Sequence, residues 1–282
     1  MALSPVDYLA IGHVTYDLLP DGSRAVGGTA AYAGLTARAL GRRVGLLTSM
    51  GPDFDSGALG EGIAIACCAA PATTTFTNNY AAGVRQQVVH KTAAPLTLAD
   101  LPEAWKSVPL VHVGPVMGEC DPEFVAYFAE RAFVGLTPQG WMRHVDASGH
   151  VAYKSWPQAE QLLPLASAVV ISLEDIQGDW SVVENWARLT KLLVVTQGGE
   201  GATLFFKCAS HHFPALDVEE ISPTGAGDIF AAAFFSVLRQ VANPQQAVRL
   251  ASCLASRSVL RLGLDSVPGP DDLSACAWTH IA

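Results

Sequence analysis

Short apolar runs recur along the chain, and each ends at glycine, proline or a polar residue. The runs cover residues 8–11, 44–50, 110–113, 133–136, 168–172 and 192–196. Such short and nearly continuous apolar runs are typical of strands that are buried on both faces. Helical patterns alternate with them, for example near residues 121–133 and 247–263. The pattern therefore predicts an α/β protein with a mostly parallel central sheet and helices on both faces.

A different pattern marks residues 73–79 and 83–89, which mix polar residues with β-forming ones. Two such segments with a short connection predict a β-hairpin. Its polar residues Asn78, Asn79 and Arg85 could contact a ligand, and we take Arg85 as the best candidate of the three. The exposed face of an ordinary sheet gives the same pattern, so the hairpin alone does not identify a site.

Residues 221–235 combine a tight turn with a buried helix. A proline and two glycines precede Asp228, and an apolar run follows it, so residues 224–228 are predicted at the N-terminus of that helix. The unpaired amides of residues 225–227 and the helix dipole favour a bound anion such as a phosphate group. Asp228 could take a proton from a hydroxyl that attacks this phosphate, or it could simply cap the helix.

The longer pattern, Pro-Thr-Gly-Ala-Gly-Asp at 223–228 before an Ala/Phe-rich helix, resembles the C-terminal signature of the PfkB (ribokinase-like) family of carbohydrate and nucleoside kinases. Two further stretches are similar to family patterns. One is a glycine pair that opens an alanine-rich helix within residues 26–41, and the other is Thr-x-Gly-x-x-Gly at 196–201. The resemblance implies one ribokinase-like domain over residues 1–282, with a small β-strand lid from segments near 14–26 and 73–89.

The resemblance also implies a role for individual residues. Asp228 is the general base, and Gly225, Ala226 and Gly227 form the anion hole. The acceptor is bound by Asp17, Gly27, Gly28 and Arg85 together with Asp228. The nucleotide is bound by Thr196, Gly198, Gly201, Thr224, Gly225, Gly227 and Ser252. Glu174 and Asp175 help to hold Mg²⁺ through water, and ATP is the phosphate donor.

The chain departs from the family pattern in several places, one of which is Ser172, where members carry the Asn of an Asn-x-x-Glu motif. Many sugar kinases carry an Asn in the helix after the glycine pair, where this chain has Ala30, Ala31, Tyr32 and Ala33. Ser252 stands where many members have an Asn. Ser222 replaces an Asp that belongs in some members to a monovalent-cation site, which argues against activation by potassium.

Composition narrows the class of partner. The chain has 282 residues, of which 50% are hydrophobic, and its formal net charge is −9. An acidic chain does not match a nucleic-acid or anionic-membrane surface, so we expect a small-molecule acceptor and ATP as partners. The family lid can also pair between subunits, which leaves a monomer or a lid-mediated homodimer.

The N-terminal residues and the cysteines bear on location. No basic segment followed by an apolar core begins the sequence, and no apolar run reaches the roughly 18 residues of a spanning helix. The cysteines form no Cys-x-x-Cys pair, and we predict buried free thiols. Together these features favour a cytoplasmic protein.

Two other classes of protein fit the sequence less well than a kinase. A catalytically inactive regulatory or scaffold homologue would keep the fold and lose the base, yet Asp228 and its glycines are intact. A dinucleotide-dependent oxidoreductase needs Gly-x-Gly-x-x-Gly directly after its first strand, and Gly12 is followed only by His-Val-Thr. The sequence therefore predicts an ATP-dependent kinase that phosphorylates a hydroxyl of a small polyol, sugar or nucleoside.

Overall fold

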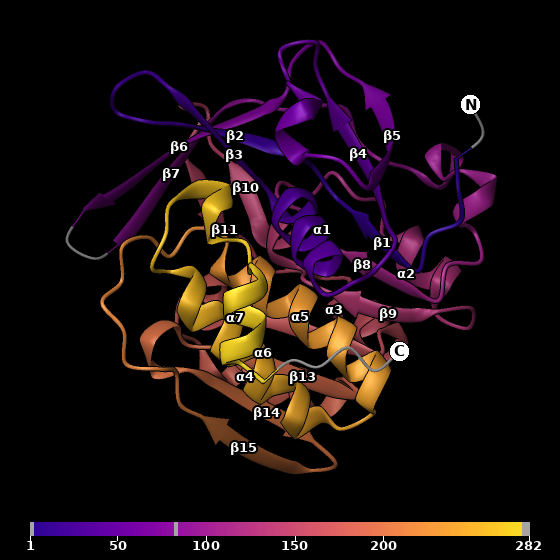
Figure 1. Cartoon of the computed structure of the whole chain (residues 1–282), viewed down its shortest axis with the longest axis vertical. Coiled ribbons are helices and arrows are strands. Elements are labelled where there is room, and N and C mark those ends of the chain that lie inside the picture. Colours follow the sequence, from indigo (N-terminus) through magenta and orange to yellow (C-terminus); the bar gives the residue numbers. More distant parts are fainter. Residues whose placement is uncertain (1–2, 82–83, 278–282) are drawn as a thin grey trace.

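The apolar runs form the centre of a nine-stranded sheet in the computed structural model, which describes residues 3–81 and 84–277 (Figure 1). The strand order is β15-β14-β13-β12-β9-β8-β1-β4-β5. The strands are β1 (Tyr8–Ile11), β4 (Val44–Met50), β5 (Ile63–Ala69), β8 (Leu110–Val113), β9 (Phe133–Leu136), β12 (Ala168–Ser172), β13 (Leu192–Thr196), β14 (Ala202–Phe206) and β15 (Ala209–Phe213). Neighbours from β5 to β13 run parallel, whereas β14 and β15 are antiparallel. The predicted mostly parallel sheet is confirmed.

Helices cover both faces of this sheet, as the α/β prediction requires. Along β1, Tyr8 and Ala10 belong to one buried cluster, while Leu9 and Ile11 belong to another. The first cluster contains the buried faces of α1 (Thr29–Ala39), α5 (Ala226–Val241) and α6 (Pro244–Ser258), and α7 (Pro270–Ala275) packs at its margin. The second contains residues of α2 (Glu123–Phe128), α3 (Ala159–Leu162) and α4 (Trp180–Leu189). Alternation along each strand thus builds two cores on opposite faces of one sheet.

A second, four-stranded sheet projects from the main one at the upper left of Figure 1. Its order is β3-β2-β6-β7, from β2 (Thr15–Leu18), β3 (Arg24–Gly27), β6 (Thr74–Ala81) and β7 (Val84–Lys91). β6 and β7 form the hairpin that the sequence predicts, and β2 pairs with β6 in parallel. The segments near 14–26 and 73–89 are therefore neighbours in space.

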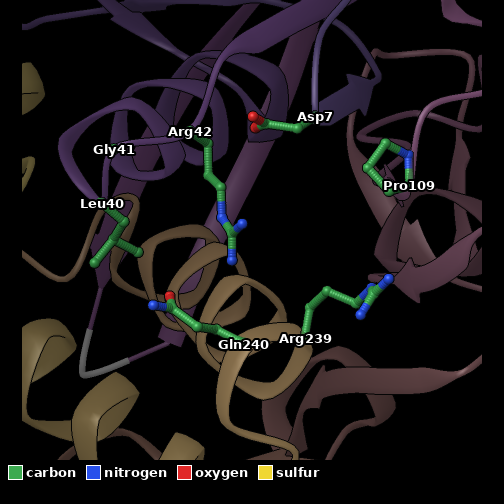
Figure 2. Close-up of a pocket in the computed structure, with 7 residues that line it drawn as sticks. All are labelled: Asp7, Leu40, Gly41, Arg42, Pro109, Arg239 and Gln240. Atoms are coloured by element: carbon green, nitrogen blue, oxygen red, sulfur yellow. The ribbon is translucent and has the colours of Figure 1, made fainter. Parts of the chain in front are cut away.

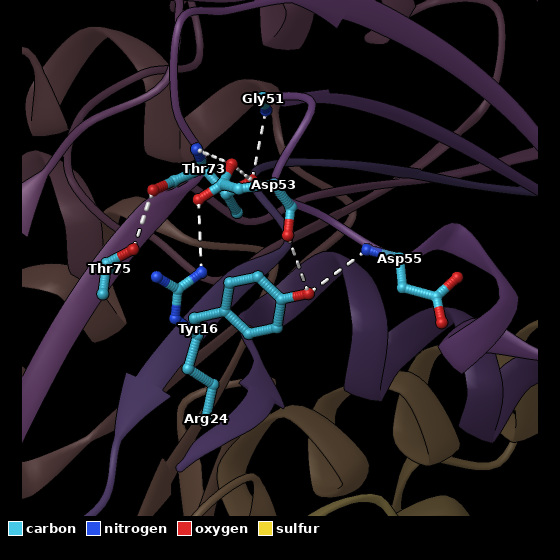
Figure 3. Close-up of polar contacts among 7 residues, drawn as sticks. All are labelled: Tyr16, Arg24, Gly51, Asp53, Asp55, Thr73 and Thr75. Carbon is cyan, nitrogen blue, oxygen red and sulfur yellow. Dashed lines mark hydrogen bonds and ion pairs between the residues drawn. The ribbon is translucent and has the colours of Figure 1, made fainter. Parts of the chain in front are cut away.

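Asp53, just after β4, ties this second sheet to the main one (Figure 3). Its carboxylate accepts hydrogen bonds from the amide and the hydroxyl of Thr73, at 2.9 and 2.8 Å, and it lies 3.5 Å from the Arg24 guanidinium on β3. The Tyr16 hydroxyl on β2 donates to the Asp53 carbonyl and accepts from the Asp55 amide. Burial raises the pKa of Asp53, but the hydrogen bonds from Thr73 outweigh it and lower the pKa. The junction is therefore held by an ionised carboxylate.

Several elements differ from those predicted. Strand β5, the hairpin β14–β15 and the small sheet of β10 (Arg143–Val145) and β11 (Val151–Tyr153) are not predicted by the apolar pattern. The helix predicted at 247–263 begins earlier, at Pro244, and ends at Ser258, and the helix predicted near 121–133 covers only Glu123–Phe128. Single 3-10 turns lie at Ser56–Leu59, Leu98–Asp100, Glu103–Trp105, Gln139–Met142, Leu163–Leu165, Leu173–Ile176, Gly198–Glu200 and Gly263–Ser266.

The cysteine prediction is wrong for most of the cysteines. Cys253 on α6 and Cys276 after α7 form a disulfide, with Cα atoms 5.8 Å apart. Cys67 and Cys208 are exposed, Cys68 is half-buried, and Cys120 is buried. The pairing joins residues 23 positions apart, which spacing alone cannot identify. No helix among the described residues is long and apolar enough to cross a membrane.

Candidate active site

Tightly packed loops follow the parallel strands at their carboxyl ends. A Cβ added to Gly12, after β1, would lie 2.4 Å from the Gly114 carbonyl oxygen after β8, so the two backbones touch. The buried Glu119 carboxylate accepts hydrogen bonds from the amides of His13 and Val116, at 2.9 and 3.0 Å. These contacts fix the loops at the sheet edge where open α/β proteins bind ligands.

The N-terminus of α5 lies at this edge and carries the predicted anion hole. Gly225 is its N-cap with φ of 82°, a backbone conformation that favours glycine. A Cβ at Gly227 would meet no heavy atom within 4 Å, so this part of the turn faces open space. Asp228 stands in the first turn and is half-buried. The turn therefore offers helix amides to a ligand with a carboxylate beside them.

Hydrogen bonds to the end of α6 help to fix where this turn sits. The amides of Ile221 and Ser222 both donate to the carbonyl of Val259, at 2.8 and 3.0 Å, and Val259 is the C-cap of α6. The Thr224 amide, next along, donates to the Ser222 hydroxyl at 3.4 Å. The sequence places Thr224 at the start of the helix, and the structure agrees.

Tyr32, in the first turn of α1, links the two halves of the site. A Cβ at Gly225 would lie 2.5 Å from the Tyr32 ring, so the α5 N-cap rests on that ring. Burial raises the pKa of the Tyr32 hydroxyl, and the charges of Asp17 and Asp228 raise it further. Both predicted carboxylates are therefore close enough to act on one phenol.

Asp17 lies on β2 within the second sheet and is half-buried. Its carboxylate accepts a hydrogen bond from the Asn78 amide on β6 at 2.8 Å, and Asn78 accepts one from Gln87 on β7 at 2.8 Å. A Cβ at Gly27 would lie 3.1 Å from the Asp17 carboxylate, which explains the glycine there. Sequence reasoning named Asn78 but missed Gln87, because the cross-strand pair of Asn78 with Gln87 depends on the hairpin register.

Gly28 is the N-cap of α1, with φ of 89°. A Cβ there would lie 2.4 Å from the His13 carbonyl oxygen and 3.1 Å from the Thr15 amide. The glycine therefore permits close backbone packing at the helix start. Its predicted contact with the acceptor stays a prediction.

The Thr-x-Gly-x-x-Gly stretch forms a closed turn after β13. The Gln197 amide donates to the Gly201 carbonyl at 2.8 Å, and a Cβ at Gly201 would lie 2.1 Å from the Phe213 carbonyl oxygen. Gly198 is exposed, and a Cβ there would meet nothing within 4 Å. Thr196 ends the strand, and its hydroxyl donates to the Ile171 carbonyl. One glycine thus closes the turn while the other leaves its outer face open.

Glu174 and Asp175 follow β12, whose Ser172 pairs with Thr196 of β13. The two acids and the glycine turn are therefore neighbours at the sheet edge. Asp175 accepts a hydrogen bond from the Ser172 amide at 3.2 Å and another from Gln139. Glu174 is exposed. Among the described residues no group of three or more metal-binding side chains comes together, so any cation here needs ligands from elsewhere.

Ser252 lines a cavity of about 230 Å³ between α6 and the segment after β15. The other lining residues are Phe213, Pro214, Leu216, Arg249 and Cys253. The Ser252 hydroxyl is buried and has no hydrogen-bond partner among the described residues. The cavity has the mixed apolar and polar lining of a small-molecule pocket.

Two remaining features lie apart from this arrangement. The backbone of Arg85 lies in β7, but its side chain is outside the described part of the structure. A second cavity, of about 350 Å³, lies before β1 and β8 and beside the C-terminal ends of α1 and α5, at the opposite edge of the sheet (Figure 2). Arg42 and Arg239 point into it, and Arg42 donates to the Ser236 carbonyl near the end of α5.

Comparison with known proteins finds similarity to kinases. Residues 155–270 match the model of the pfkB family of carbohydrate kinases. The chain is 26% identical to a cytidine kinase of Thermococcus kodakarensis, over 87% of this chain and 93% of that one. It is 28% identical to an inositol 3-kinase of Oryza sativa subsp. japonica, over 93% of this chain and 70% of that one.

Solved structures share the fold. A pyrophosphate-dependent kinase of the ribokinase family superposes with a TM-score of 0.80 at 22% identity, covering 95% of this chain and 99% of that one. Ribokinase from Thermotoga maritima superposes with a TM-score of 0.74 at 21% identity, covering 97% of this chain and all of the other (100%). The fold is ribokinase-like.

Proposed function

Because residues 155–270 match the pfkB family of carbohydrate kinases, we propose that the chain is a kinase of this family and transfers the γ-phosphoryl group of ATP to a hydroxyl of a small uncharged polyol. The observation that carries the proposal is the start of α5, where an open glycine turn and Asp228 lie side by side. A reaction between a phosphate and a hydroxyl needs donors for the phosphoryl oxygens and an acceptor for the hydroxyl proton, and this turn offers both.

The chemistry of the step follows from the turn. The acceptor hydroxyl attacks the γ-phosphorus while its proton moves to the Asp228 carboxylate, and the bond from phosphorus to the bridging oxygen of ATP breaks. The amides of residues 225–227 and the dipole of α5 stabilise the charge on the phosphoryl oxygens as the bond changes. Holding the two reactants in line supplies much of the remaining acceleration.

Two features support ATP as the donor. The open turn at Gly198 and the turn at Gly227 both present backbone without side-chain cover, as close approach to phosphates requires. The cavity beside Ser252 offers an enclosed volume near the end of α6, and its buried hydroxyl lacks a partner that a nucleotide base could supply. The use of ATP favours the cytoplasm, although a disulfide such as Cys253–Cys276 is uncommon in reducing compartments.

Of the two acids predicted to help bind magnesium, Glu174 is the better placed to do so. Mg²⁺ prefers oxygen ligands and keeps several waters, and with nucleotides it takes most of its other ligands from phosphates. Glu174, exposed beside the glycine turn, would hold a magnesium-bound water, while Asp175 already accepts hydrogen bonds from Ser172 and Gln139. When bound, the ion neutralises phosphate charge.

The acceptor side favours an uncharged, hydroxyl-rich molecule. The Asp17 carboxylate, oriented by Asn78, accepts hydrogen bonds from hydroxyl groups and repels a phosphate group. The relatives named inositol 3-kinase and fructokinase act on such molecules by name, and the cytidine kinase adds a nucleoside. We take a cyclic polyol as the first acceptor to test.

The second sheet is the lid of the proposed enzyme. It carries Asp17 and joins the main sheet through the contacts of Asp53, so it can settle over a bound acceptor and exclude water. Its outer strand β3 is also a surface through which a homodimer would form, whereas the outer edge of β7 already pairs with Gly149 and His150. Amide exchange in β6 and β7 should slow when the acceptor binds, and unchanged exchange would contradict a lid.

The test is a phosphorylation screen of the purified chain with ATP and Mg²⁺. The acceptors are myo-inositol, fructose, ribose and cytidine, each with pyrophosphate as a second donor in parallel reactions. Phosphorylation of at least one acceptor in a manner that needs ATP supports the proposal. If the protein is folded and binds ATP but phosphorylates none of these acceptors, the result would favour the inactive regulatory alternative instead.

A further inference from the structure

Tyr32 carries a hydroxyl that nothing in the site described so far uses. The side chain is 1% exposed, and its hydroxyl has no hydrogen-bond partner among the residues that the structure describes. A buried hydroxyl without a partner is unfavourable, because it gives up its hydrogen bonds to water and gains none in return. Such a group calls for an explanation.

The surroundings of this hydroxyl are those of the reaction centre. The ring supports the N-cap of α5 at Gly225, directly before the amides of the anion hole. Asp17 and Asp228 both act electrostatically on the phenol, one from the lid and one from the main domain. With its pKa raised, the phenol stays neutral and keeps its proton for donation.

We propose that Tyr32 is a specificity-determining residue whose hydroxyl hydrogen-bonds a hydroxyl of the bound acceptor between Asp17 and Asp228. The inference rests on the proposed kinase function. The hydroxyl is shielded in this structure, so contact with the acceptor requires the atoms that cover it to move. An acceptor that supplies the missing partner is favoured over one that leaves the phenol unpaired.

Tyr8 provides a matched comparison within the same core. It is also fully buried, but its hydroxyl lies 2.8 Å from Nδ1 of His112, whose Nε2 is 2.9 Å from the Thr137 hydroxyl. Burial lowers the pKa of His112 to about 3, so the hydrogen bonds of its ring with Tyr8 and Thr137 join neutral side chains. Tyr8 therefore has a structural partner in the free protein, whereas Tyr32 has none.

The two tyrosines should respond in opposite ways to loss of the hydroxyl. Tyr32→Phe removes an unpaired group, so the melting temperature of the free protein should stay equal to that of the wild type or rise. The KM for the acceptor should rise about fivefold to tenfold, the effect of one neutral hydrogen bond, while the KM for ATP stays within twofold. Tyr8→Phe should lower the melting temperature and leave the acceptor KM unchanged.

The experiment measures melting temperatures and steady-state kinetics for the wild type, Tyr32→Phe and Tyr8→Phe. The acceptor is the member of the myo-inositol, fructose, ribose and cytidine set that the wild type phosphorylates fastest. If the wild type is active and Tyr32→Phe keeps the wild-type acceptor KM, or loses stability as Tyr8→Phe does, the role of Tyr32 is overturned while the kinase function stands. If the wild type phosphorylates none of the four, the kinase function fails and this inference fails with it.

Discussion

Two helices in this molecule begin with the same spacing of glycine and aspartate and use it differently. In α5 the N-cap is Gly225 and Asp228 follows three residues later; in α7 the N-cap is Gly269 and Asp272 follows three residues later. Asp272 is 4% exposed, and its carboxylate accepts hydrogen bonds from the Gly269 amide, Arg257 and Arg261. It is a cap that is fully engaged in holding its helix.

Asp228 differs from Asp272 in its surroundings. Gly225 adopts a left-handed conformation, whereas Gly269 is extended. Asp228 is half-buried beside Gly227, whose outer face is open. The same residues three positions apart therefore give a structural cap in one helix and a candidate reaction centre in the other. The surroundings, and not the motif, separate the two roles.

The largest effect that sharpens this contrast is expected at the α5 N-cap. Gly225→Ala adds a Cβ at φ of 82° and 2.5 Å from the Tyr32 ring, so the turn must shift. Displacing oxyanion donors lowers kcat by about 10²–10³ in other enzymes, and we expect a loss of that size here. Steady-state kinetics on a variant shown to be folded by circular dichroism provide the measurement. Wild-type turnover would remove the anion-hole role of this turn.

The next effect concerns stability at the α7 cap. Asp272→Asn replaces a carboxylate that accepts hydrogen bonds from two arginines, and hydrogen bonds to charged groups contribute about 1.5–3 kcal/mol. We expect a loss of that order in the free energy of unfolding at pH 7, with kcat unchanged. Urea unfolding together with the kinase assay measures both quantities. If Asp272→Asn lost activity but not stability, Asp272 would not be a purely structural cap, and the contrast with Asp228 would fail.

The pH dependence of this loss has a defined sign. Burial raises the pKa of Asp272, but hydrogen bonds from the Gly269 amide, Arg261 and Arg257 outweigh it and lower the pKa below its usual value. The contribution of the ionised carboxylate is therefore complete above about pH 4, near the unfolded pKa, and is lost as the pH falls through the folded pKa. The stability difference between wild type and Asp272→Asn should be constant from pH 7 to 5 and shrink below pH 4. A constant difference at every pH would contradict a charge-based cap.

The smallest effect is expected at Gly227. An added Cβ would meet no atom there, and Gly→Ala changes at compatible positions stabilise proteins by about 0.4–1 kcal/mol. We expect Gly227→Ala to be slightly more stable than the wild type and to bind ATP more weakly, because the methyl group enters the open space before the amides. Thermal unfolding measures the stability of the variant, and titration with ATP measures its affinity for the nucleotide. Unchanged ATP affinity would show that phosphate does not approach this face.

Much of this account could be predicted from local sequence. The continuous apolar runs gave the central strands, because strands buried on both faces need no polar alternation. The glycine and proline positions located the starts of α1 and α5. The hairpin β14–β15 was missed because its turn uses Lys207 and Cys208 at positive φ in place of the usual glycine or asparagine.

The features that could not be predicted from the sequence depend on contacts between distant segments. The contact of Tyr32 with Gly225 and the Cys253–Cys276 bond appear only once helices far apart in the chain are packed together. The Asn243-Pro244 start of α6 was readable, since Asn caps Gln246 and Pro suits the first turn, but the alanine-rich pattern placed the helix later. Residue type gave the candidates, and tertiary packing decided how they are arranged.

The most direct test of the central claim measures kcat and ATP affinity for Asp228→Asn on the acceptor that the wild type phosphorylates fastest. If Asp228 is the general base, kcat should fall by about 10²–10⁴, the usual contribution of a general base, while ATP binds within a few-fold of the wild-type affinity and the fold stays intact. Asp272→Asn, measured alongside, should show wild-type kcat and reduced stability. A kcat for Asp228→Asn within a few-fold of the wild type would contradict the account, because Asp228 would then be a helix cap like Asp272.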